Sequence, residues 1–163
     1  MPKMMRLRAN GFSLIELVMV IIILGILAAT AIPRFASQSA YDERFFYEDV
    51  LAGLRYSHKL AMTSGCRVEF NRNANGFELQ HDNNCFNAAS AADFSLDVYR
   101  PGEGVGYSID SWSGDTSWTS DDNPLIFTPR GQVTDTGGSV LNSTTLSAGG
   151  RSIIIDGQTG FIR

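Results

Sequence analysis

The chain has 163 residues and a formal net charge of −4, and its composition is uneven along its length. Its length suits one domain with an accessory segment. Three basic residues and no acidic one precede Gly11; without residues 1–11 the 13 basic side chains fall to 10 while all 17 acidic ones remain, which leaves a net charge of −7. A body this acidic argues against broad binding to a phosphate backbone, so no nucleic acid is expected as a partner.

The amino-terminal segment contains an uncharged run, residues 17–32, directly after the carboxylate of Glu16. A carboxylate in hydrocarbon costs several kcal/mol unless it is paired or protonated. Three interpretations are open. The segment could be a secretory signal cleaved at the small residues 29–31, or a plain membrane anchor of the usual length over residues 12–32. Alternatively, cleavage after Gly11 could precede the apolar run and leave the basic residues in the cytoplasm.

Only cleavage after Gly11 supplies a partner for Glu16. The cut creates a new α-amino group on Phe12, four residues before Glu16. In a bundle of parallel copies, this ammonium can neutralise the Glu16 carboxylate of a neighbouring subunit. Such an ion pair adds little net stability but can set the register of the bundle, because a mispaired buried charge is heavily penalised.

The stretch GFSLIE, residues 11–16, followed by the apolar run, resembles the class III signal of type IV pilins and pseudopilins. The resemblance implies a prepilin peptidase that cuts after Gly11 and methylates the new amino terminus at Phe12. Glu16 then falls at the fifth position, where the family has its glutamate. Gly25 and Pro33 fall at the fourteenth and twenty-second positions, which also match, and are assigned as helix-kink positions.

A single long helix is expected from about Phe12 to Met62, roughly 75 Å at 1.5 Å per residue, with a kink at Pro33. Its first half is apolar on all sides and needs lipid or neighbouring helices. Its second half has one apolar stripe and needs a sheet to cover it. The stripe consists of Ala36, Ala40, Tyr47, Val50, Leu51, Leu54, His58 and Ala61.

Runs of alternating or apolar residues predict an antiparallel sheet after the helix. The expected strands are 66–70, 77–80, 94–98, 125–127, 152–156 and 161–162. The first two form a hairpin around residues 71–76, and the last two flank a closing turn at 157–160. Strands that follow one helix indicate an α+β fold, in which the second half of the helix packs on the sheet.

Two cysteines, Cys66 and Cys85, lie in the polar body. From the sequence alone they could be free thiols, a redox pair or a structural bridge. No CxxC spacing is present, and the two histidines do not complete a zinc pattern. If the body is exported, a disulfide is the natural interpretation, and it would contribute about 3 kcal/mol by restricting the unfolded chain.

Two tryptophans, Trp112 and Trp118, stand in the acidic loop 110–124. They could cover the sheet edge or the helix groove, or form a partner surface, since aromatic anchors dominate the energetics of interfaces. The acids of this loop do not match the spacing of an EF-hand.

Chemistry-bearing residues are sparse in the body. His58 is expected to be a hydrogen-bonded core or boundary residue, and the pair His81–Asp82 to lie in a solvated loop. No catalytic constellation, metal site or cofactor is predicted, so the protein is not expected to be an enzyme.

The carboxyl-terminal patterns at 126–131, 154–156 and 159–162 look like those of H-type pseudopilins and FimT-like minor pilins. The apolar segment with two body cysteines resembles the minor pilins of mannose-sensitive haemagglutinin (MSHA) pili. The resemblance implies a leader at 1–11, a transmembrane and polymerisation segment at 12–34, and a periplasmic domain at 35–163.

The same resemblance implies a function in pilus assembly and adhesion. The expected partners are the prepilin peptidase, other major and minor pilins, the inner-membrane assembly platform, and membrane lipid before assembly. Two alternatives stay open: a minor pseudopilin of a type II secretion system, or a tip subunit that binds a ligand or DNA.

Overall fold

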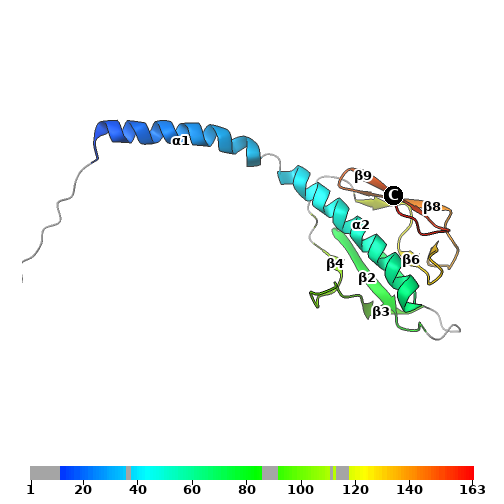
Figure 1. Cartoon of the computed structure of the whole chain (residues 1–163). Coiled ribbons are helices and arrows are strands. Elements are labelled where there is room, and N and C mark those ends of the chain that lie inside the picture. The colour runs from blue at the N-terminus through cyan, green and yellow to red at the C-terminus, as the bar shows by residue number, and fades with distance from the viewer. Residues whose placement is uncertain (1–11, 36–37, 86–91, 111, 113–117) are drawn as a thin grey trace, which may run out of the picture. The chain divides into compact units, whose positions relative to one another are not determined.

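The computed structural model describes residues 12–35, 38–85, 92–110, 112 and 118–163 (Figure 1). The chain divides into two compact units, Met1–Gln38 and Ser39–Arg163. The leader expected at 1–11, including Gly11, lies outside the described residues.

The expected single helix is present as two elements. Helix α1 spans Leu14–Phe35 and helix α2 spans Gln38–Ser64, with residues 36–37 outside the description. Helix α1 continues through Pro33, so the expected kink stays a prediction. Within the part of the chain that the structure describes, neither helix combines the length and the apolarity needed for a membrane crossing.

The larger sheet of the body has the strand order β3-β2-β1-β6-β7, and β4 pairs with β2 at one end. All pairings are antiparallel. The strands are β1 (Val68–Asn73), β2 (Gly76–Asp82), β3 (Phe94–Asp97), β4 (Ser108–Ile109), β6 (Leu125–Phe127) and β7 (Val133–Thr134). The predicted first hairpin is confirmed, although its strands extend further into the turn and pair Asn73 with Gly76.

A second sheet, which the sequence did not predict as separate, has the order β5-β8-β9. It consists of β5 (Thr119–Ser120), β8 (Ser143–Ala148) and β9 (Arg151–Asp156). Strand β8 was missed because its residues are mostly Ser and Thr. They nevertheless alternate, and Thr144, Leu146 and Ala148 point into the core. The expected closing hairpin is present as a bridge between Ile155 and Ile162.

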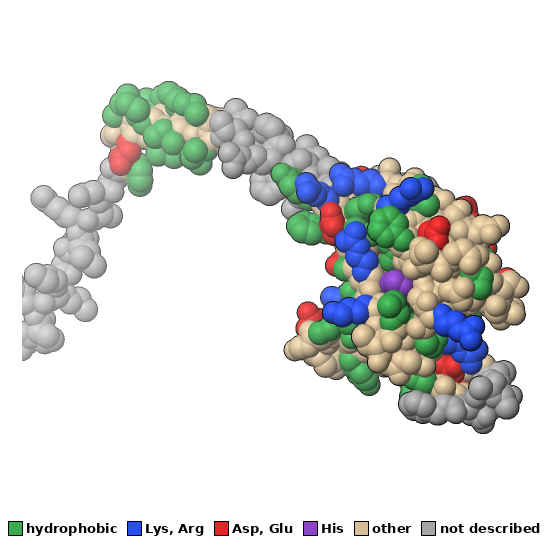
Figure 2. Space-filling model, turned by 45° about the vertical axis from the view of Figure 1, so that its right-hand side comes forward, with side chains coloured by type: hydrophobic (Ala, Val, Ile, Leu, Met, Phe, Trp, Pro, Cys, Tyr) green, Lys and Arg blue, Asp and Glu red, His purple; other side chains and the backbone are tan. Residues whose placement is uncertain are grey.

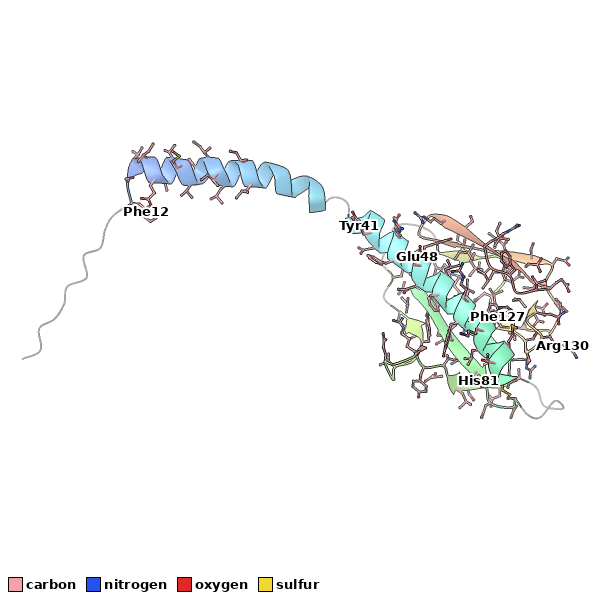
Figure 3. The ribbon with its side chains drawn as sticks, in the orientation of Figure 1. Phe12, Tyr41, Glu48, His81, Phe127 and Arg130 are labelled. Atoms are coloured by element: carbon pink, nitrogen blue, oxygen red, sulfur yellow. A yellow bond between two sulfur atoms is a disulfide. The ribbon has the colours of Figure 1, made fainter. Side chains whose placement is uncertain are left out.

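Helix α2 provides the apolar surface on which the body is built, as its stripe predicts (Figure 1). Leu54 is fully buried, and Phe127 of β6 belongs to the same core cluster (Figure 3). The rings of Phe70 and Phe77 stack at 4.7 Å between centroids, beside Gly53. The smaller sheet contacts the start of the same helix, because the turn glycine Gly149 lies against the backbone of Glu43.

The disulfide joins Cys66, just after α2, to Cys85, just after β2. This pairing was one of three possibilities left open by the sequence. It ties the end of the helix to the end of the second strand.

Candidate functional site

The amino terminus of α1 is held by Ser13. The Ser13 hydroxyl oxygen accepts a hydrogen bond from the Glu16 backbone N–H at 3.2 Å, and the Ser13 carbonyl accepts one from Leu17 N–H at 3.2 Å. This is the Ser half of a capping box, a pattern of Ser or Thr followed three residues later by Glu. The spacing of Ser13 and Glu16 is visible in the sequence, but this capping box was not predicted from it. It places Glu16 in the first helical turn, where a negative charge is favoured.

The described surface of α1 is apolar and exposed from Leu14 to Leu27. Its large side chains from Leu14 to Leu27 are exposed, except that Val18 is half-buried. Figure 2 shows hydrophobic side chains gathered on this helix, and Figure 3 shows side chains pointing outward along it, with Phe12 at its start. Glu16 is exposed and has no ion-pair partner among the described residues.

Trp118 belongs to the core of the body. It is 7% exposed, its indole N–H donates to the Gly76 carbonyl at 2.7 Å, and its ring meets Phe46 edge-on. A buried side chain cannot serve as an exposed anchor, so the partner-surface hypothesis is wrong for Trp118. Trp112 is half-buried and stacks on Phe46 at 4.2 Å. Both tryptophans therefore cover helix α2 around Phe46, which was the other predicted interpretation.

His58 is a boundary residue, as predicted. Its Nε2 lies 3.1 Å from the Gly131 carbonyl, and its ring is tilted against Phe127. The turns at Gly131 and Gly160 approach this ring closely, since both glycines have positive φ and a Cβ on Gly160 would collide with His58.

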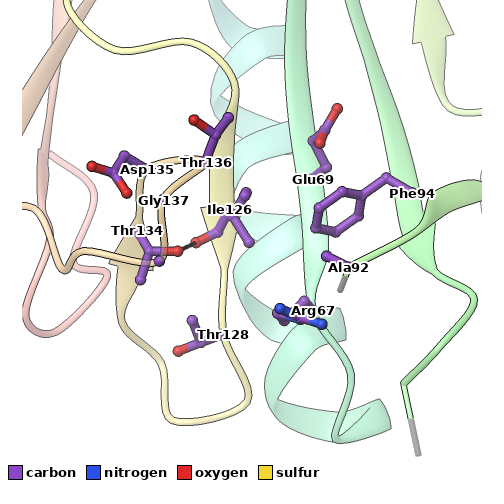
Figure 4. Close-up of a pocket in the computed structure, with 11 residues that line it drawn as sticks. Arg67, Glu69, Ala92, Phe94, Ile126, Thr128, Thr134, Asp135, Thr136 and Gly137 are labelled. Carbon is purple, nitrogen blue, oxygen red and sulfur yellow. Dashed lines mark hydrogen bonds between the residues drawn. The ribbon is translucent and has the colours of Figure 1, made fainter. Parts of the chain in front are cut away.

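A shallow groove of about 580 Å³ lies on the face of the larger sheet that is turned away from α2 (Figure 4). Side chains alternate along a strand, so Phe70 faces the helix while Glu69 faces the groove. Glu69 pairs across the strands with Ile126, which pairs with Thr134. The loop that begins at Asp135 forms one wall.

Asp82 is fixed at the end of β2 and is 1% exposed. Arg67 donates to its Oδ2 at 2.8 Å through Nε, and the backbone N–H groups of Asn84 and Asp93 donate to its Oδ1. Burial opposes ionisation, but these hydrogen bonds and the Arg67 charge outweigh it and lower the pKa of Asp82. The prediction of a solvated loop at His81–Asp82 is therefore wrong, because both residues end strand β2. The Asp82 carboxylate can be buried there because its hydrogen bonds offset the loss of contact with water.

Glu69 contrasts with Asp82. It is 9% exposed and has no hydrogen-bond or ion-pair partner among the residues that the structure describes. Burial, and secondly the nearby Glu78 carboxylate, raise the pKa of Glu69. Nothing in the sequence distinguished this acid, because a polar residue in a strand is usually a solvated outward position.

Among the described residues, His, Cys, Asp and Glu nowhere gather in a set of three that could hold a metal ion. Asp115 of the acidic loop lies outside the described residues.

An exposed apolar helix that precedes a body built on a second helix and antiparallel sheets is the architecture of a pilin-like subunit. Two family models match the sequence: the prokaryotic N-terminal methylation motif over residues 6–32, and type II transport protein GspH over residues 47–159. The second covers more than half of the chain. The chain therefore belongs to the type II transport protein GspH family, within the type IV minor pilins and pseudopilins, which are structural subunits and not enzymes.

Two known proteins are similar to parts of the chain. The type IV narrow pilus major component PilA5 of Thermus thermophilus is 40% identical over 55 residues; the match covers 34% of this chain and 47% of that protein, about half of its length. The crystal structure of the type IV minor pilin FimU of Pseudomonas aeruginosa PAO1 matches with a TM-score of 0.51 at 16% identity, covering 76% of this chain and 87% of that one. This second likeness confirms the predicted α+β, pilin-like fold.

Proposed function

We propose that the protein is a minor pilin that is processed at its amino terminus and then joins, or primes, a filament. Prepilin peptidase cuts between Gly11 and Phe12 and methylates the amino group of Phe12. Residues 12–34 hold the subunit in the inner membrane, with residues 35–163 in the periplasm. The assembly platform then transfers the subunit into a bundle of major and minor pilins.

The observation that carries this proposal is the unshared apolar surface of α1. Large exposed apolar patches on proteins mark interaction sites, and this helix exposes nearly all of its large apolar side chains from Leu14 to Leu27. Lipid before assembly and neighbouring helices after assembly both satisfy it, so transfer need not expose the segment to water.

Glu16 provides the register in this proposal. Its carboxylate lies one helical turn from the amino terminus that cleavage would create on Phe12, and it has no ion-pair partner in the described part of the chain. The amino group of a neighbouring subunit can neutralise it, and a misaligned neighbour would leave two charges unpaired in an apolar bundle.

The filament that we propose is an MSHA-type pilus used in adhesion, on the strength of the apolar segment and the two body cysteines. A short pseudopilus of a type II secretion system is the second candidate, and the family description, type II transport protein GspH, favours it. The chromosomal neighbours of the gene separate these two systems: adhesin-pilus genes support the first and secretion genes the second.

Substitution of Glu16 tests the mechanism. We expect Glu16→Gln to be cleaved normally but to be depleted from sheared filaments, whereas Gly11 replaced by a bulkier residue should block cleavage itself. Glu48→Gln, an exposed acid on α2, is the matched control and should behave as wild type. Mass spectrometry of the mature amino terminus and immunoblots of the filament fraction give the readouts. Normal incorporation of processed Glu16→Gln, or a mature protein that begins at Ile32 or still carries Met1, contradicts the proposal.

A further inference from the structure

The groove on the outer face of the larger sheet contains a buried acid without a counter-charge. Glu69 is about nine-tenths buried as a residue, lines the groove, and has no hydrogen-bond or ion-pair partner in the described structure. Figure 4 shows Glu69 and Asp135 on opposite sides of the groove, with Arg67 toward one end.

The other charges of the groove leave it negative. The Arg67 guanidinium is already matched by Asp82, at 2.7 Å between Nη2 and Oδ2. Asp135 uses Oδ1 to accept the Ser139 N–H at 2.8 Å, and its Oδ2 stays available. Two carboxylates therefore line this groove, and Arg67, the one basic residue among the described residues that line it, is already paired.

The walls between these charges combine apolar side chains with the threonines Thr128, Thr134 and Thr136. Ile126 forms the floor beside Glu69, and Ala92 and Phe94 line the β3 side. A lysine or arginine side chain has this character, because its aliphatic stem packs on apolar surface while its charged end reaches a carboxylate. The Phe94 ring offers an additional favourable surface for a cation. A divalent metal fits less well, since the described residues form no set of three ligands here.

We infer that this groove binds the lysine or arginine side chain of a neighbouring pilin subunit, with Glu69 as its main ion-pair partner. The occupant is assigned to a protein because this chain belongs to a family of subunits that assemble with one another. The inference rests on the proposed function. It adds a contact between the globular parts of neighbouring subunits to the proposed contact between their amino-terminal helices. Burial, and secondly the Glu78 carboxylate, raise the pKa of Glu69, and a cation bound beside it would lower that pKa.

A peptide titration tests the groove on the full chain in detergent micelles. The probes are the capped tripeptide acetyl-Ala-Arg-Ala-amide and its citrulline analogue, which has the same shape without the charge. We expect the arginine peptide to bind wild type and to bind Glu69→Gln about tenfold more weakly, the range of a charge-assisted hydrogen bond. The citrulline peptide should not distinguish the two proteins.

Glu48→Gln is the matched control, because Glu48 is an exposed acid on α2 that does not line the groove. It should leave the affinity for the arginine peptide unchanged. Thermal unfolding of each variant shows that the body is folded. Equal binding of the arginine and citrulline peptides, no binding of either, or no effect of Glu69→Gln overturns the inference.

Spermidine separates the two sources of cationic ligand. Tighter binding of this free polyamine than of the arginine peptide would identify a small-molecule site and would also overturn the assignment to a subunit. Filament incorporation and its dependence on Glu16 do not enter these measurements. Failure of the groove is thus distinguishable from failure of the proposed function.

Discussion

Helices α1 and α2 are similar in length, 22 and 27 residues, but they differ in what covers them. Leu24 of α1 is 58% exposed, whereas Leu54 of α2 is completely buried. The second helix finds its apolar partners within its own chain, in two sheets that share one core cluster. The large side chains of the first helix from Leu14 to Leu27 are exposed, apart from Val18. The difference separates a self-sufficient body from a segment whose stable environment must come from outside.

The largest expected effect is loss of a buried leucine. Leu54→Ala should lower the free energy of unfolding of the body by about 4 kcal/mol, because it leaves a cavity under α2. The matched change Leu24→Ala should leave this value unchanged. Urea unfolding of the full chain in micelles, followed by tryptophan fluorescence, measures both. Similar losses for the two variants would mean that α1 contributes to the body's core.

Removing the disulfide should have the next largest effect. Replacing both Cys66 and Cys85 with Ser should cost about 3 kcal/mol, since the unfolded chain regains the entropy of the closed loop. Unfolding with and without a reductant gives the comparison: wild type should lose this amount when reduced, and the double variant should not respond. A wild-type midpoint that is insensitive to reduction would contradict the prediction.

Gly53 in α2 and Gly25 in α1 allow the same substitution to be compared in the two helices. A Cβ at Gly53 would lie 2.7 Å from the ring of Phe77, which is fully buried and cannot retreat, whereas a Cβ at Gly25 meets nothing within 4 Å. Gly53→Ala should therefore destabilise the body by about 2 kcal/mol through overpacking, although alanine is the better helix former. Gly25→Ala should leave the melting temperature of the body unchanged. Calorimetric scans of the two variants test this, and a more stable Gly53→Ala would show that the core can yield.

The smallest expected effect depends on pH. Asp82→Asn should cost about 1 kcal/mol at neutral pH, because the Arg67 pair is lost while the backbone donors still find an oxygen. The pKa of Asp82 is lower in the folded state than its ordinary value of 3.8, so the unfolded state binds more protons between the two values. The contribution is thus complete above the ordinary pKa and disappears as pH falls through the folded one.

Unfolding curves of wild type and Asp82→Asn at several pH values check this sign. The exposed Asp97→Asn serves as the control and should follow wild type throughout. A difference that grows on acidification would refute the assignment of Asp82 as a stabilising anion.

Much of the fold followed from periodicity. The stripe through Leu54 and His58 identified the face of α2 that packs on the sheet, and alternation located the β1–β2 hairpin around Val68 and Phe77. Strand β8 escaped because Thr144 is polar by composition, although its side chain is buried. Alternation without apolar residues is a weak signal when only one sequence is read.

The functional residues divide in the same way. The segment from Phe12 to Glu16 was recognisable because its pattern is local. The groove was not, because Glu69, Ile126 and Asp135 come together only when strands that are far apart in the sequence pair. Asp82 was misjudged for a related reason: its hydrogen-bond donors lie in Arg67 and in the residues that follow, and their arrangement exists only in the folded state.

In the filament that we propose, the contact between Gly149 and the backbone of Glu43 would resist separation of the small sheet from α2. The Arg151 guanidinium beside the β8–β9 turn lies over the ring of Tyr47 and provides a second contact with α2. Glycine at 149 allows the β8–β9 turn to lie directly against α2, because a Cβ at this position would collide with the Glu43 backbone.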